Sequence, residues 1–119
     1  MRNWNALEER YLQDDLPARL GNLASNLARI KSRCQNVANG ELVAELLQES
    51  KLFIEWTAQD TEIDIAAELV ELQIQLACWQ YDWTKIWADI EQRRTVSEQS
   101  RIWSEKVLQM SGLLAVKMI

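Results

Sequence analysis

Apolar residues recur along this chain at intervals of three and four, the spacing of one face of an α-helix. The longest such run extends from Thr61 to about Arg94 and predicts one continuous helix. Its apolar seam is Ile65, Leu69, Leu72, Leu76, Trp79, Trp83, Ile86 and Ile90. At 1.5 Å per residue this helix would be about 50 Å long. Other helices must therefore run alongside it to bury the seam, in the manner of coiled-coil heptads.

The same stretch carries a second apolar arc, made of Ala66, Val70, Ile74, Ala77, Tyr81 and Ala88. A helix that is apolar on two faces is either central in its own fold or shared with another subunit. We favour the shared helix, which predicts a homodimer with Val70, Ile74 and Tyr81 in its interface. The alternative is that the small residues of the arc let another helix of the same chain approach closely.

Three of the six tryptophans, Trp79, Trp83 and Trp87, follow one another at intervals of four and predict an aromatic ridge on the long helix. Such a ridge is typical of a packed core or of a subunit interface, and we assign it to the interface. Binding of a small molecule is the less favoured interpretation, because no polar group converges on the ridge in the sequence pattern.

Four further helices are predicted around the long one. A short amphipathic segment runs from Asn3 to about Asp14. At Leu16 and Pro17 a second helix begins, or a continuous one kinks, and it closes at Asn39 and Gly40. The seam of that second helix is Leu16, Leu20, Leu23, Leu27, Ile30, Cys34 and Val37. A third helix spans about Glu41 to Ala58, and Asp60 is a suitable N-cap for the long helix. The pattern Thr95 to Glu98 resembles a capping box and predicts the start of a last helix. The apolar stripe of this last helix is Trp103, Val107, Met110, Leu114 and Met118.

Composition supports an all-α fold in one domain, residues 1–119, with 48% apolar and 26% charged residues. Three glycines and one proline leave little material for the turns of a β-protein. We expect an antiparallel bundle of four long helices plus the short N-terminal helix, assembled as an oligomer. No apolar run approaches the roughly 18 residues that a membrane span needs, so we expect a cytoplasmic protein with no membrane segment. Cys34 and Cys78 are expected to be reduced thiols.

Charge is unevenly distributed within a net charge of −5. Residues 16–39 contain four bases and no acid, whereas residues 41–75 contain nine acids and a single base, Lys51. The two segments should attract each other. Four bases without accompanying aromatics make a modest patch, so a nucleic-acid partner is not expected.

Two acids lie within the wide apolar arc of the third helix. On the helical wheel Glu49 falls between Trp56 and Leu42, and Glu45 falls between Leu52 and Trp56. A carboxylate among apolar neighbours needs a cation, a hydrogen bond, a proton or a metal to offset its lost hydration. A salt bridge to Arg29 or Arg33, or a place at the wet edge of the bundle, is favoured over a role as a ligand.

Histidine is absent from the sequence, which excludes imidazole bases and catalytic triads that depend on histidine. Any catalysis would therefore rest on carboxylates and a hard cation such as Mg²⁺. Two helices that present acids at intervals of four and three could converge on one such ion.

Glu45-Leu-Leu-Gln-Glu49 followed by Glu68-Leu-Val-Glu71 resembles the E-E-x-x-E and E-x-x-D signature of the all-α nucleoside triphosphate pyrophosphohydrolases, the MazG and dimeric dUTPase relatives. The resemblance covers only about Glu41 to Trp79. It implies that Glu45, Glu49, Glu68 and Glu71 would hold Mg²⁺ for a nucleoside triphosphate in an enzyme that oligomerises through its helices. Leu46 stands where the family has its second glutamate, and Glu71 replaces an aspartate.

Two functions are therefore compared below. The favoured one is a non-catalytic, dimerising interaction or scaffold protein that needs no cofactor and has itself or another protein as its partner. The alternative is a magnesium-dependent pyrophosphohydrolase-like protein. The two differ in whether the four glutamates converge on an open cleft.

Overall fold

The computed structural model describes residues 3–112, and within that range all regular structure is helical. Six α-helices and two 3₁₀ turns follow one another in the order α1 Trp4–Gln13, α2 Leu16–Arg33, η1 Val37–Asn39, α3 Gly40–Thr57, η2 Ala58–Asp60, α4 Ile63–Tyr81, α5 Trp83–Ala88 and α6 Ile90–Met110. The all-α prediction is confirmed. The predicted residues Leu114 and Met118 lie outside the described range.

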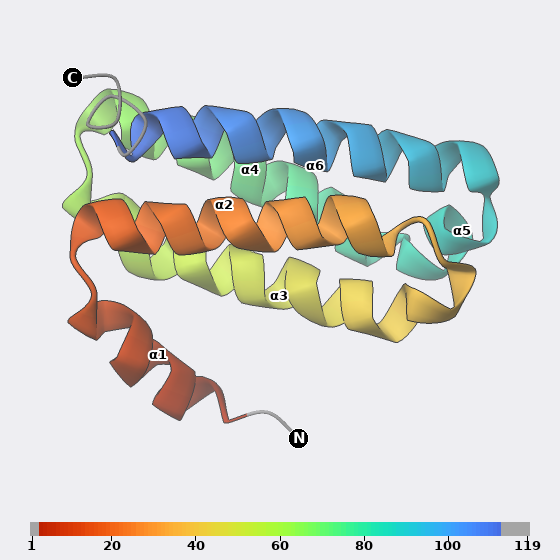
Figure 1. Cartoon of the computed structure of the whole chain (residues 1–119), viewed down its shortest axis with the longest axis horizontal. Helices are drawn as coiled ribbons and strands as arrows, with labels where there is room; N and C mark the ends of the chain where they lie inside the picture. Colours follow the sequence, from red (N-terminus) through yellow and green to blue (C-terminus); the bar gives the residue numbers. More distant parts are fainter. Residues whose placement is uncertain (1–2, 113–119) are drawn as a thin grey trace.

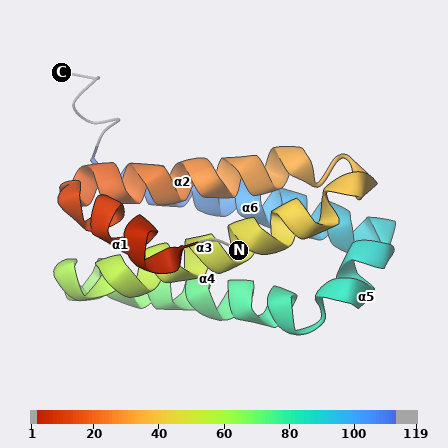
Figure 2. The same cartoon turned by 90° about the horizontal axis from the view of Figure 1, so that it is seen from below.

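The four longest helices lie side by side, and the chain reverses direction between α2 and α3, between α3 and α4, and between α4 and α6 (Figure 1). The most extensive pairing is between α2 and α6, followed by α2 with α3 and α3 with α4. The short helix α1 lies across the α3 side of this arrangement (Figure 2).

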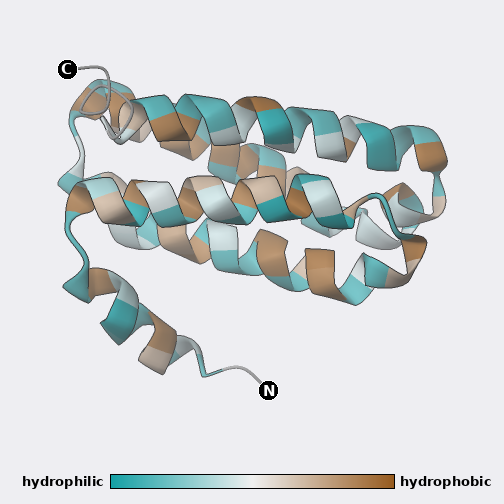
Figure 3. Ribbon diagram, in the orientation of Figure 1, coloured by the Kyte–Doolittle hydropathy of each residue, from teal (hydrophilic) through white to brown (hydrophobic). Residues whose placement is uncertain are grey.

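Helix α2 begins where the sequence predicts, because Asp15 caps it and Pro17 occupies its first turn. The Asp15 side chain accepts a hydrogen bond from the Ala18 amide at 3.0 Å. The predicted seam is buried along α2, but its last residue, Val37, lies beyond the helix in η1 and is 61% exposed. The fully covered side chains of the seam include Leu20, Leu23, Leu27 and Ile30. Hydrophilic and hydrophobic residues alternate along the long helices accordingly (Figure 3).

The predicted continuous helix from Thr61 to Arg94 is wrong. Helix α4 ends at Tyr81, α5 is a separate short helix, and α6 begins at Ile90 and runs back along the molecule. A rod of about 50 Å would also exceed the longest dimension of the fold, 41 Å. The seam residue Ile90 is 54% exposed as a result.

Local capping explains the revised boundaries. The Asp89 side chain accepts from the backbone amides of Glu91 and Gln92 at 2.9 and 3.5 Å, so α6 starts here and the predicted start at Thr95 is wrong. The pKa of Asp89 is held below its usual value by these hydrogen bonds, chiefly by the one from the backbone amide of Glu91.

Two other predicted boundaries also change. Asp60 does not cap α4, because its carboxylate binds Arg19 at 3.0 Å. Gly40 does not end the second helix. Helix α2 stops at Arg33, and Gly40 is the first residue of α3.

Candidate functional site

The four glutamates of the predicted metal site lie in different environments. Glu49 is buried at 7% exposure on α3, whereas Glu45, expected in the apolar arc of the same helix, is exposed. On α4, Glu71 is exposed and Glu68 is half-buried. Within residues 3–112 no three side chains of the acidic, histidine or cysteine type form a group that could hold a metal ion.

Glu49 faces α2, where a buried asparagine supports its carboxylate. The Asn26 side-chain amide donates to Glu49 Oε1 at 3.0 Å, and Arg29 donates to Asn26 Oδ1 at 3.3 Å. The chain Arg29–Asn26–Glu49 connects the acid to a base through an amide. The side chains border a hollow of about 230 Å³ between α2 and α3. Arg29, one of the two bases predicted to pair with Glu49, is thus connected to it by an asparagine that the sequence pattern did not single out.

Glu68 faces the other way, toward α6. Its carboxylate lies 3.7 Å from Lys106 Nζ, and both side chains are about half exposed. Glu49 therefore points to α2 and Glu68 to α6, so these two predicted ligands face different helices.

The second apolar arc predicted for the long helix is largely exposed on α4. An unbroken series of exposed apolar or small residues, which we name the α4 stripe, recurs every three or four positions. It consists of Ile63, Ala67, Val70, Ile74, Cys78 and Tyr81. Ile63 and Tyr81 are 84% and 89% exposed, and Ile74 is 59% exposed. The opposite face of α4, which includes Leu69, Leu72 and Leu76, is fully buried.

The tryptophans do not form the predicted ridge, because the helix that should carry them is broken between Trp79 and Trp83. Trp79 is 6% exposed and lies in the core of the chain. The indole N–H of Trp83 donates to the Gly40 carbonyl at 3.1 Å, and that of Trp87 donates to the Val37 carbonyl at 2.8 Å. These two bonds hold α5 against η1 and the first residue of α3.

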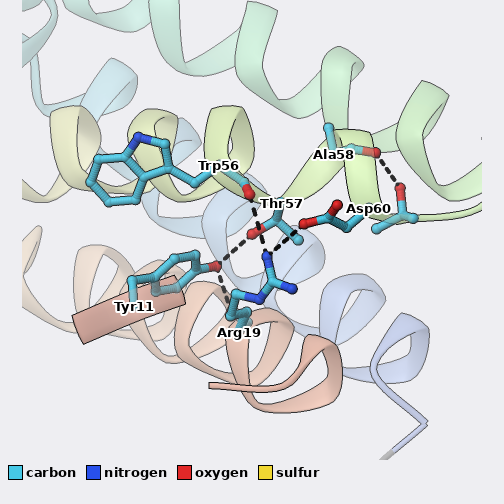
Figure 4. A network of polar contacts seen from close by, with 7 residues as sticks. Tyr11, Arg19, Trp56, Thr57, Ala58 and Asp60 are labelled. Atoms are coloured by element: carbon cyan, nitrogen blue, oxygen red, sulfur yellow. Dashed lines mark hydrogen bonds and ion pairs between the residues drawn. The ribbon is translucent and has the colours of Figure 1, made fainter. Parts of the chain in front are cut away.

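A buried polar network that the sequence did not reveal joins α1, α2 and the end of α3 (Figure 4). The Tyr11 hydroxyl donates to the Arg19 carbonyl at 2.9 Å, so the Thr57 hydroxyl, also at 2.9 Å, donates to Tyr11. The Arg19 guanidinium binds Asp60 and the Trp56 carbonyl at 3.0 and 3.3 Å. Arg19, one of the four bases in the predicted positive segment, thus forms an ion pair within the fold.

Burial shifts the pKa of two titratable side chains, Tyr11 and Cys34. Desolvation raises the pKa of Tyr11 to about 12, although the Thr57 hydrogen bond opposes this shift. Burial likewise raises the pKa of the Cys34 thiol to about 11, against the opposing charge of Arg93. Cys34 and the exposed Cys78 are both free thiols, as predicted. A thiol with a raised pKa and little exposure is a poor nucleophile.

Comparison with protein-family models, with curated proteins and with solved structures finds no match for this chain. The resemblance to pyrophosphohydrolases therefore depends on the spacing of two pairs of glutamates alone. Among the helices of residues 3–112, none is both long enough and apolar enough to cross a lipid bilayer.

Proposed function

We propose that this protein is a non-catalytic interaction or scaffold protein, an antiparallel helical bundle that pairs with a second copy of itself through the α4 stripe. The exposed stripe is the observation that carries the proposal. A run of large apolar side chains along one helix face is unusual on the surface of a monomer and is typical of an interaction site.

The chemistry of the stripe favours a helical partner. Its spacing of three and four residues is that of a coiled-coil seam. Helix α4 is about 28 Å long, so a matching helix could contact the stripe over several turns. No charged side chain belongs to the stripe, because the acids Asp64, Glu68 and Glu71 fall on one flank of the helix. On the other flank Gln73 and Gln80 are bonded to α3.

A second copy is the partner that requires no further assumption. In a pair with two-fold symmetry the same patch lies on both subunits, so each stripe covers the other. The predicted interface residues Val70, Ile74 and Tyr81 belong to this surface. Trp79, Trp83 and Trp87 pack within the chain and are left out of the proposed interface.

The oligomeric state tests the proposal. Sedimentation equilibrium at micromolar concentration should give a dimer, and Ile74→Glu should convert it to a monomer because a carboxylate would be buried in the interface. Gln75→Glu adds the same charge to the same helix outside the stripe and should leave the dimer intact. Because each copy has a net charge of −5, added salt should strengthen pairing. A wild-type monomer under these conditions would refute the proposal.

A metal titration distinguishes the pyrophosphohydrolase alternative from the proposed interaction protein. With Glu49 and Glu68 facing different helices, we expect no calorimetric binding of Mg²⁺ in the millimolar range. Mg²⁺ uptake by the wild type that is lost in both Glu49→Gln and Glu68→Gln would favour the enzyme instead. The conservative amide replacements keep the size of the side chains, so such a loss would report on the charge.

A further inference from the structure

Two adjoining hollows at the α5 end of the molecule share one lining residue, Arg93. The first, about 360 Å³, is mainly apolar and is bordered by Val37, Ala44, Trp83, Trp87 and Ala88. The second, about 280 Å³, is lined by polar and apolar surface in about equal parts and is bordered by Gln35, Ile90, Arg94, Ser97 and the buried thiol of Cys34. The first hollow has the volume of a small-ligand site.

The two tryptophans offer their rings to the apolar hollow. Their indole N–H groups are already bonded to the carbonyls of Gly40 and Val37. The ring centroids are 5.2 Å apart with the planes tilted by 34°. Both rings are held in place by the fold, so an apolar ligand would not have to order them.

Arg93 supplies the convergent polar group that the sequence pattern lacked. Its guanidinium carbon lies 5.6 Å from the centre of the Trp87 ring, and its Nη1 donates to the Trp87 carbonyl at 2.5 Å. A guanidinium has five N–H donors, and no carboxylate within residues 3–112 forms an ion pair with this one. Arg93 is therefore a positioned cation at the junction of the two hollows.

We propose that this place binds a small carboxylic acid with an aromatic or branched aliphatic body. The body lies against Trp83 and Trp87, and the carboxylate accepts hydrogen bonds from Arg93. Arginine suits this role because its planar fork matches a carboxylate. Arg94 is bonded to Glu91 at 3.2 Å and is exposed, so it contributes little. Glu41 borders only the apolar hollow, and its charge directs the carboxylate toward Arg93.

The test uses naphthoate and its neutral analogue naphthylmethanol as probes in heteronuclear NMR titrations. The acid should shift the indole N–H signals of Trp83 and Trp87 and leave that of Trp103, which lies on α6 in the core, unchanged. The neutral alcohol should bind at least about tenfold more weakly, because it cannot accept a charge-assisted hydrogen bond from Arg93. Equal binding of the two probes, or no shift at millimolar naphthoate, would overturn the proposal.

Matched arginine variants identify the residue that binds the carboxylate. Arg93→Gln should weaken naphthoate binding about tenfold and leave the weak binding of the alcohol unchanged, which shows that the apolar hollow persists. Arg94→Gln removes the same charge from the neighbouring position and should have an effect of less than about twofold. Equal effects of the two variants on the acid would contradict the assignment to Arg93.

A third variant tests the proposal independently if Arg93→Gln displaces the Trp87 ring. Glu41→Gln leaves Arg93 and both tryptophans in place and removes the like charge beside the ligand. Naphthoate should then bind about twofold to fivefold more tightly, with a smaller gain at high salt, while naphthylmethanol is unaffected. Weaker or unchanged binding of naphthoate would count against the proposed orientation.

Discussion

Glu49 is a buried acid whose carboxylate accepts a hydrogen bond from a side chain on the neighbouring helix α2. Its position in an apolar arc suggests a site, but the sequence does not show that Asn26 on α2 lies opposite. The Asn26 amide donates to the carboxylate, and Arg29 in turn donates to the amide oxygen. A polar pair of this kind orients two helices relative to each other, because an offset would break the hydrogen bond between Asn26 and Glu49.

The loss of the hydrogen bond between Asn26 and Glu49 should lower the free energy of unfolding. Glu49→Ala leaves the buried Asn26 amide without its acceptor and should cost about 1–3 kcal/mol. Glu49→Gln retains an acceptor oxygen and should cost less. Urea unfolding measures both, with Glu45→Ala on the exposed side of α3 as the control, expected within about 0.5 kcal/mol of the wild type. Equal losses in the alanine and glutamine variants of Glu49 would show that charge, rather than the acceptor, is what matters.

Tyr11 should make the protein sensitive to alkali. Its pKa is raised to about 12 in the folded chain, whereas an unfolded tyrosine ionises near 10. Between these pH values the unfolded chain has lost the phenolic proton and the folded chain has kept it, so the free energy of unfolding falls as pH rises. Below about pH 10 the raised pKa of Tyr11 makes its full contribution to the free energy of unfolding.

The variant Tyr11→Phe separates this effect from other titrations. At neutral pH it should be about 1–3 kcal/mol less stable, because the hydroxyl joins the Arg19 carbonyl and Thr57. From about pH 10 to 12 the gap between variant and wild type should narrow. Denaturant unfolding at a series of pH values measures the gap, and the contribution of Cys34, present in both proteins, cancels. A gap that stays constant would mean that the Tyr11 phenol is not protected.

At the scale of elements, the break between α4 and α6 is the main difference between prediction and structure. Heptad spacing continues through Asp82 and Asp89, and no glycine or proline interrupts it, so periodicity alone predicts one helix. Hydrogen bonds from the Trp83 and Trp87 side chains to α3 and η1 favour a turn instead. Asp89, an N-cap residue type followed by an acid in the first turn, was the one local signal of a new helix.

Other elements were predictable because a single physical pattern determines them. The seam of α2 is apolar on one side only, so its buried leucines and Ile30 could be named in advance. The two apolar faces of α4 could also be recognised, since neither depends on a distant residue. The surroundings of Glu49, Glu68 and Arg93 could not, because each involves a side chain from another helix at a position that periodicity does not determine.

Contact between α5 and α3 requires a glycine. A Cβ atom at Gly40 would lie 2.8 Å from Trp87 Nε1, closer than atoms tolerate. Gly40→Ala should therefore displace the indole from the Val37 carbonyl and destabilise the fold by about 1–3 kcal/mol. This outweighs any gain from alanine at the first residue of α3, which is at most the roughly 0.5–1 kcal/mol that applies in a helix interior. Thermal unfolding measures the sum, and the loss should disappear when Trp87→Leu is also present. An additive double variant would contradict the steric explanation.

At the scale of the whole molecule, one hydrophobic core joins all the long helices, and α2 contributes to it from end to end. Leu27 has no exposed surface. Leu27→Ala should cost about 2–5 kcal/mol because it leaves a cavity between packed helices. Leu12→Ala on α1, where the side chain is 45% exposed, is the matched control and should cost much less. Chemical denaturation checks both values. Similar losses would show that the helices are not tightly packed around α2.

The pairing of α2 with α6 also has a consequence during biosynthesis. A ribosome releases α2 long before α6, since α3, α4 and α5 come between them. Throughout that interval the apolar face of α2 lacks α6, the helix with which it pairs most extensively. The nascent polypeptide then exposes an apolar surface of the kind that chaperones bind. Completion of the native state must therefore wait until α6 has emerged from the exit tunnel.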